Sequence, residues 1–216
     1  LPYFYFLIKY FMNKNLLGIL FMTLGMFSLS VNDMTYKNLT MNFPVWEAVF
    51  FRALSGSIIS LFMVYRTGIG SIKTQKPVRH FVRAFSAVGC VVLYIFGIKY
   101  LQLSENIAIA HSAPIIAAIL AVPILGEKIG IHRVAAIVIG FIGVLIIVKP
   151  GTDLFQLKSL LPIGSALFMA SVYLSTRSLM NTESSTSIVF YYSFALLFTS
   201  IIFFPSDFII PDIFNL

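Results

Sequence analysis

Four ionisable side chains, Asp33, Glu47, Arg52 and His111, lie in stretches of sequence that are otherwise apolar. A carboxylate can bind a cation or a proton, a guanidinium can hold a carboxylate through two parallel hydrogen bonds, and an imidazole can exchange a proton. Ionisable residues are rare in apolar helices and usually face a bundle interior or a water-filled path. These residues therefore indicate the binding of a polar small molecule, provided that the surrounding elements bring them together.

The elements that carry these residues are predicted to cross a membrane. Hydrophobic residues make up 59% of the 216 residues and charged residues 11%, whereas a soluble domain carries about 25% charged residues. The mean hydropathy is +0.94. Backbone groups in lipid must be satisfied within the segment, so apolar runs of this length predict helices. We expect an all-α integral membrane protein with about seven transmembrane helices, near residues 16–36, 44–65, 79–98, 106–125, 130–148, 159–177 and 186–205.

The basic residues follow the membrane topology. The net charge of +7 could suggest a nucleic-acid partner, but that function would need a solvated basic face. With the N-terminus inside, ten Lys and Arg residues fall on inner segments and four on outer ones, which is the positive-inside pattern. We therefore expect a cytoplasmic N-terminus, a lipid bilayer as the surroundings, and no nucleic-acid partner.

Motifs for catalysis and for cofactors are missing from the sequence. It contains no glycine-rich phosphate loop, no HExxH, no GxSxG and no Cys/His cluster, so neither ATP hydrolysis nor a metal or cofactor site is expected. Cys90 stands alone in an apolar run and is expected to pack. The first residues, "LPYFYFLIKYF", lack a signal-peptide pattern. The sequence "MNKNLLGIL" suggests a start at Met12, with residues 1–11 as extra or upstream sequence.

Helix geometry places the charges at different depths. Arg52 follows Pro44 by eight residues, which is about 12 Å along a helix and close to the middle of a bilayer core. Glu47 lies one turn from the outer end of its span, as does Asp33 from the end of its own. Glu47 and Arg52 are separated by about 140° around the helix, so they do not point along one line.

Each charged residue has a structural alternative. Arg52 is expected to meet either a ligand anion or Asp33, in an ion pair that only holds two helices together. Glu47 alternatively reaches out to the membrane interface. His111 alternatively makes a hydrogen bond between packed helices. The aromatic residues nearby, Trp46, Phe50 and Tyr94 among them, either belong to the interfacial belt or stack on a ligand. All seven are candidate substrate-pathway residues.

A weak internal repeat appears when the chain is shifted by 140 residues. "WEAVFF" at 46–51 then falls on "TSIVFY" at 186–191, and Asp33, Glu47 and Arg52 fall on Tyr173, Ser187 and Tyr192. A repeat of five helices is odd in number, so the second copy is inverted in the membrane. We expect a first repeat at 12–150 and a partial second repeat of two helices at 151–216. Either further helices or a second copy of the chain would complete the bundle.

The sequence resembles the drug/metabolite transporter superfamily, of the EamA type. The resemblance is carried by "ENIAIAHSAPIIAAILAVPIL", by "LGEKIG" and by "HRVAAIVIGFIGVLIIVKPG". It covers nearly all of residues 14–205. The resemblance implies ten helices in two inverted five-helix repeats, of which about three helices are absent here, in a bacterial inner membrane. It also implies a secondary transporter and not an enzyme.

Within that superfamily, "SLSVNDMTYKNL" followed by "WEAVFFRAL" is similar to the bacterial importers of S-adenosylmethionine. By this analogy Arg52 would hold a carboxylate, Asp33 or Glu47 would face an ammonium or sulfonium group, and aromatic residues would stack on adenine. The expected function is alternating-access transport of a small organic metabolite that is S-adenosylmethionine-like or amino-acid-like. The alternative is a membrane fragment or assembly subunit that does not transport, in which the charges serve helix packing only.

Overall fold

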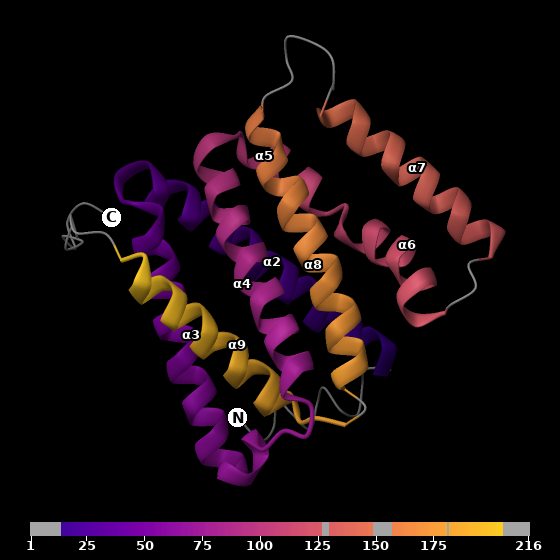
Figure 1. Ribbon diagram of the computed structural model, residues 1–216. Coiled ribbons are helices and arrows are strands. Elements are labelled where there is room, and N and C mark those ends of the chain that lie inside the picture. Colours follow the sequence, from indigo (N-terminus) through magenta and orange to yellow (C-terminus); the bar gives the residue numbers. More distant parts are fainter. Residues whose placement is uncertain (1–13, 127–129, 149–156, 181, 205–216) are drawn as a thin grey trace.

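The computed structural model describes residues 14–126, 130–148, 157–180 and 182–204, which form a bundle of helices (Figure 1). Within these ranges no strand occurs, and the predicted all-α fold is confirmed. Residues 1–11, expected to be extra sequence, lie outside the described residues. The elements are α2 (Lys14–Asn42), α3 (Val45–Thr67), η1 (Ile69–Ile72), α4 (Pro77–Tyr100), α5 (Leu103–Ala110), α6 (Ala113–Leu125), α7 (Ile131–Val148), η2 (Leu157–Ser159), α8 (Leu160–Leu179) and α9 (Ser185–Ile202).

Six stretches of the described residues are long and apolar enough to cross a membrane. They lie in α2, in α3, in α4, in the range of α5 and α6 together, in α8 with η2, and in α9. The remaining predicted span, 130–148, corresponds to α7, whose apolar part, Val134–Ile146, is shorter. Many large hydrophobic side chains point outward on these helices, as expected of surfaces that contact lipid. The chain is a multi-pass membrane protein.

Proline, glycine and a capping serine mark where several helices begin and end. α3 begins directly after Pro44, and it ends before Gly68, whose φ of 87° suits a residue without a side chain. α4 has Pro77 in its first turn, where a missing backbone N–H costs nothing. The Ser184 side chain caps α9 by accepting a 3.0 Å hydrogen bond from the backbone N–H of Ser187. These local signals set the ends of the helices at the α3–α4 and α8–α9 connections.

The fourth span is two helices and not the single helix predicted for 106–125. α5 ends at Ala110, a turn covers His111 and Ser112, and α6 begins at Ala113. Pro114 in the first turn of α6 explains the break. It has no N–H to donate to the carbonyl of Ala110, so the helical hydrogen-bond ladder is interrupted there.

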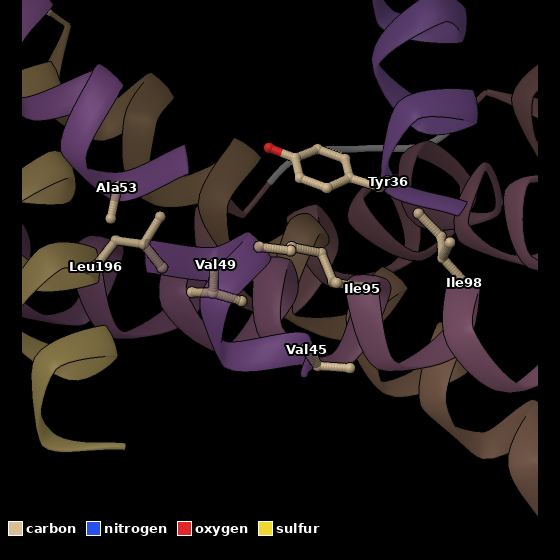
Figure 2. Packing of buried hydrophobic residues seen from close by; sticks show 8 residues of the cluster. Tyr36, Val45, Val49, Ala53, Ile95, Ile98 and Leu196 are labelled. Atoms are coloured by element: carbon tan, nitrogen blue, oxygen red, sulfur yellow. The ribbon is translucent and has the colours of Figure 1, made fainter. Parts of the chain in front are cut away.

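Two helix pairs form the centre of the bundle. α4 packs most extensively on α8, and α3 on α9. α6 and α7 lie to one side of these pairs, with α7 outermost (Figure 1). A cluster of buried hydrophobic residues joins α2, α3, α4 and α9, and includes Tyr36, Val49, Ile95, Ile98 and Leu196 (Figure 2). This cluster holds α2 against the bundle near the candidate site.

Small residues let α4 and α8 approach closely. A Cβ atom added at Gly89 would lie 3.0 Å from the Phe168 ring. The hydroxyl groups of Ser86 and Ser171 lie 3.0 Å apart, and Ser165 donates a 2.9 Å hydrogen bond to the carbonyl of Cys90. Close contact between small residues is the usual basis of helix association in membranes. Cys90 is buried and packs in this interface, as its apolar surroundings predict.

Candidate functional site

A cavity of about 260 Å³ lies between α2, α3 and α9. Its polar lining comes from all three helices, and its apolar lining from α3 and α9. The residues that line it are Asn32, Tyr36, Arg52, Ala53, Ser55, Gly56, Ile59, Tyr192, Ser193 and Leu196. Since Gly56 and Ser193 lie near the middle residues of α3 and α9, the cavity sits about halfway along both helices.

Arg52 is the cationic group of this cavity. Its guanidinium carbon lies 5.7 Å from the centroid of the Tyr36 ring, a cation–π distance. Its Nη1 lies 3.5 Å from Oδ1 of Asn32, at the outer limit of a hydrogen bond. The phenol groups of Tyr36 and Tyr192 interact with it electrostatically. Arg52 thus interacts with the Tyr36 ring, the Tyr192 phenol and the Asn32 amide, and it lines the cavity.

The structure does not form the ion pair considered between Asp33 and Arg52. Among the described residues, Arg52 has no carboxylate within 4.0 Å, although Asp33 is close enough to interact with it electrostatically. The Asp33 carboxylate instead accepts a 2.9 Å hydrogen bond from the hydroxyl of Tyr94 on α4. Asp33 and Tyr94 are therefore brought together next to the cavity, whose walls they do not form.

Asp33 lies deeper than the sequence suggests. α2 continues to Asn42 and does not end near residue 36, so nine residues follow Asp33, or about 14 Å of helix. Arg52 lies at a comparable distance from the start of α3, which faces the same end of the bundle. The prediction that Asp33 and Glu47 lie at a similar depth is wrong, because the structure places Asp33 near the level of Arg52.

His111 occupies the turn between α5 and α6. Its Nδ1 lies 2.8 Å from the carbonyl oxygen of Ile107, one turn earlier on α5. A carbonyl only accepts, so Nδ1 carries the proton and caps the end of α5. The hydrogen bond expected between two packed helices is instead a bond within its own helix. His111 still interacts electrostatically with Asp33, so it belongs to the Asp33–Tyr94 group.

Glu47 is buried in the protein and does not extend outward, as the interface alternative requires. Its exposed fraction is 1%, in the first turn of α3. A carboxylate at this place benefits from the positive end of the helix dipole. Glu47 is not among the residues that line the cavity, so the structure separates it from Arg52.

Trp46 and Phe50 contact other aromatic rings. The Trp46 ring is stacked at 4.7 Å on Phe203, just after α9, and meets Phe96 of α4 edge-on at 6.0 Å. Phe50 meets Phe204 at 5.0 Å. Neither Trp46 nor Phe50 lines the cavity. These rings join the start of α3 to the end of α9.

Of the ten residues that line the cavity, Arg52 alone was among the site residues predicted from the sequence. Asn32 and Tyr36 lie on α2, and Tyr192 and Ser193 lie on α9. One sequence signal pointed to Tyr192, because the shift of 140 residues places it over Arg52. The structure starts α3 at Val45 and α9 at Ser185, which are also 140 residues apart.

The cavity can bind a small molecule with an anionic group. A guanidinium offers two parallel donors to a carboxylate, and tyrosine rings offer flat surfaces to a planar or cationic group. No cluster of three or more His, Cys, Asp or Glu side chains suited to a metal ion occurs in the part of the chain that the structure describes.

The sequence profile of the EamA-like transporter family matches residues 16–149. Among the curated relatives, a riboflavin transporter of Vibrio cholerae is 37% identical over 56% of this chain and 41% of its own length. An S-adenosylmethionine uptake transporter of Rickettsia felis is 30% identical over 82% of this chain and 60% of its own length. A pseudopaline exporter of Pseudomonas aeruginosa is 26% identical over 90% of this chain and 68% of its own length.

The aligned part of the chain thus spans 41% and 60% of the first two relatives. No solved structure matches the chain significantly. These relatives are named as transporters or exporters, which agrees with the expectation that the chain is not an enzyme.

Proposed function

Because the chain belongs to the EamA-like transporter family, we propose that the complete protein moves a small organic metabolite across the membrane by alternating access, and that the cavity at Arg52 binds it. The observation that carries this proposal is the position of Arg52 in a cavity halfway along two spanning helices. A cation inside a helix bundle is costly. An anionic substrate group at the guanidinium reduces that cost, which gives the charge a function.

The proposed substrate is S-adenosylmethionine or another amino-acid-like compound. Arg52 binds its carboxylate, and Tyr36 and Tyr192 flank its flat or cationic parts. Asp33, oriented by the Tyr94 hydroxyl, faces the ammonium or sulfonium group. The similarity to S-adenosylmethionine uptake transporters supports this choice. Glu47 is a weaker candidate for the cationic group. Neither carboxylate lines the cavity, but Asp33 directly follows the lining residue Asn32 and interacts with Arg52, whereas Glu47 lies in the first turn of α3.

Riboflavin is the second candidate substrate. The similarity to the riboflavin transporter of Vibrio cholerae favours it. Tyrosine rings suit its flat ring system, and riboflavin has no carboxylate for Arg52. The two substrates therefore differ in how strongly their transport depends on the guanidinium.

Several finer features belong to the same proposal. We place the N-terminus in the cytoplasm of a bacterium, from the distribution of basic residues. We divide the chain into a first repeat at 12–150 and part of an inverted second repeat at 151–216. The start of α3 and of α9 at residues 140 apart supports this division. His111, Trp46 and Phe50 act on the path near the cavity and not in its wall, and either further helices or a second copy completes the path.

Uptake by the full-length protein in liposomes tests the proposal. Labelled S-adenosylmethionine is supplied alone and with unlabelled riboflavin or methionine as competitors. Hydrogen bonds to charged groups contribute about 1.5–3 kcal/mol, so Arg52→Ala should lower uptake at low substrate concentration by roughly 10- to 100-fold. Arg52→Lys should retain part of the activity, because it keeps the charge and loses the two-pronged geometry.

Arg66→Ala is the matched control. Arg66 is an exposed arginine in the last turn of the same helix, over the Phe62 ring, so its loss should leave uptake unchanged. Uptake of S-adenosylmethionine by Arg52→Ala at the normal rate would refute the role of Arg52. Competition by riboflavin together with transport that tolerates Arg52→Ala would favour the second candidate. Absence of uptake across the whole panel would favour the assembly subunit.

A further inference from the structure

A dense group of polar contacts joins two connections at the end of the bundle where α4 begins. Glu183, between α8 and α9, accepts a 3.0 Å hydrogen bond from the Thr74 hydroxyl and a 3.2 Å bond from the backbone N–H of Gln75, both between α3 and α4. Lys76 donates to the Thr182 hydroxyl at 3.1 Å. These contacts cross about 110 residues of sequence and close this end of the bundle.

Further bonds join the same two regions. The Ser184 hydroxyl donates to the carbonyl of Ser71 at 2.7 Å, and the Tyr191 hydroxyl donates to the carbonyl of Ile72 at 3.0 Å. Ser71 and Ile72 belong to η1, which follows α3. Ser184 caps the start of α9, and Tyr191 lies within α9. In Figure 1 the end of α3 and the start of α9 meet at the lower end of the bundle. The α3–α4 and α8–α9 connections are thus held together by side chains.

His80, in the first turn of α4, lies buried behind this contact. Its exposed fraction is 3%, its Nε2 lies 3.4 Å from Oε2 of Glu183, and its ring lies 4.7 Å from the Tyr191 ring. Among the described residues, neither ring nitrogen has a hydrogen bond of good geometry. A contact around a buried imidazole with one anionic neighbour and no other polar partner is more or less stable depending on whether the imidazole is charged.

The other charged groups on this face of α4 bind polar partners on α8, on α9 and on their connection. Arg79 donates to the Ser178 hydroxyl, and Arg83 donates to the Thr176 hydroxyl at 2.8 Å and to the carbonyl of Ile188 at 3.2 Å. Lys76 is bound to Thr182 as described above. The charged and titratable groups around His80 are therefore Lys76, Arg79 and Arg83 on α4, Glu183 on the α8–α9 connection and Tyr191 on α9.

Glu183 remains ionised near neutral pH. Partial burial raises the pKa of its carboxyl. Hydrogen bonds from Thr74 and Gln75, together with the nearby His80 imidazole, outweigh that effect and hold the pKa below its ordinary value of 4.5. The carboxylate is consequently present at neutral and mildly acidic pH, where it can attract a protonated imidazole.

We propose that His80 and Glu183 form a proton-binding site, and that a proton on His80 holds the α3–α4 and α8–α9 connections together. When the imidazole is charged, it completes a buried ion pair with Glu183. When the proton leaves to water, the pair is lost and the contact loosens at the end of the bundle. The proton site is argued from this contact alone. Only its use, which is to couple a proton to the opening of one end of the path, rests on the proposed transport function.

The direction of the effect follows from the charges. A protonated imidazole attracts the Glu183 carboxylate, and a neutral imidazole does not. The closed contact is therefore favoured by a lower pH and weakened by a higher pH. Glu183 sets a lower limit, because its own protonation in stronger acid would remove the anion.

Distances between spin labels test the proposal. Labels are attached to cysteines introduced at Ile69 on η1 and at Met180 at the end of α8, which are 76% and 67% exposed. The native thiol is removed by Cys90→Ala, and the full-length protein is placed in lipid nanodiscs. Between about pH 5.5 and about pH 8.5, the ratio of the longer to the shorter distance population should rise by roughly tenfold.

Three variants assign the change. His80→Gln and Glu183→Gln should give the same distance distribution at both pH values. His132→Gln should retain the shift, because His132 is an exposed histidine at the start of α7. If His80→Gln does not accumulate, Glu183→Gln on the connection answers the same question. A parent protein without a pH-dependent shift, or a shift that survives in Glu183→Gln, would overturn the proposal.

Failure of this test and failure of the proposed function are distinguishable. The distances are measured without substrate, so they do not depend on transport. A protein with a pH-dependent distance and no uptake would keep the proton site and lose the transport proposal. The opposite result would leave the cavity at Arg52 intact and remove the proton site.

Discussion

Replacing Gly97 by alanine probes how tightly α4 and α5 are packed. Gly97 is buried on α4, and a Cβ atom there would overlap with Oδ1 of Asn106 on α5, which has an exposed fraction of 0%. Asn106 also donates a 3.3 Å hydrogen bond from Nδ2 to the carbonyl of Tyr94. Alanine at 97 must therefore push the amide away from a bond that it makes in the protein interior.

The expected loss combines three effects. Overpacking a tight interior costs about 1–3 kcal/mol. Losing the hydrogen bond of Asn106 costs about 0.5–1.5 kcal/mol. Alanine in place of glycine within a helix returns about 1 kcal/mol. Gly97→Ala should thus lower the free energy of unfolding by about 0.5–3.5 kcal/mol. Each kcal/mol lowers the melting temperature by about 2–4 °C for a chain of this size.

Thermal unfolding of the detergent-solubilised protein, followed by size-exclusion chromatography, measures this change. Gly25→Ala on α2 is the matched control, since nothing lies within 4 Å of its added Cβ, and it should be neutral or slightly stabilising. The double variant Gly97→Ala/Asn106→Ala should recover part of the loss relative to the two single changes, because the overlapping oxygen is gone. If Gly97→Ala is as stable as the parent, the close approach of α4 and α5 described here is wrong.

Three further predictions concern single contacts. Tyr94→Phe removes the hydrogen bond to Asp33 and should lower the free energy of unfolding by about 1.5–3 kcal/mol, as measured by thermal melts. Combining Tyr94→Phe with Asp33→Asn should add little further loss. Lys37→Met removes two 2.7 Å hydrogen bonds to the carbonyls of Ile98 and Leu101 and should cost about 1–3 kcal/mol in the same assay, whereas an unchanged melting temperature would contradict their importance. The depressed pKa of Glu183 stabilises the fold at pH values above the ordinary pKa of 4.5. This stabilisation is lost as the pH falls through the folded-state pKa. In a pH series of thermal melts, Glu183→Gln should therefore lack this acid-sensitive part of the stability.

The helices were predictable because their signal is local. Long apolar runs and the prolines and glycines at their ends indicate spans without knowledge of any neighbour. Pro114 carried the signal for the break between α5 and α6. Its effect depends on whether the freed carbonyl finds another hydrogen-bond donor, and the local sequence does not identify that donor.

The contacts of the candidate site were less predictable. A helix that is apolar on most sides does not indicate which face points inward, so the rotation of α2 about its axis was undetermined. An ion pair between Asp33 and Arg52 was one of two alternatives, but the rotation and the length of α2 bring Asp33 to Tyr94 and bring Asn32 and Tyr36 to the cavity. Tyr192 was within reach of sequence reasoning only through the repeat.

The crossing of α3 and α9 has a mechanical consequence. The two helices meet most closely at their middles, where an added Cβ at Gly56 would lie 3.5 Å from the Ser193 hydroxyl and where Ser57 donates to the Ser193 carbonyl at 3.3 Å. Small side chains there let the two backbones approach closely. The ends of the pair are joined as well, by Ser184 and Ser71 next to η1 and by the stacked rings of Trp46 and Phe203 at the opposite end. In the proposed alternating-access transport, the cavity would open first to one side of the membrane and then to the other, as one of these two contacts breaks and the other is kept.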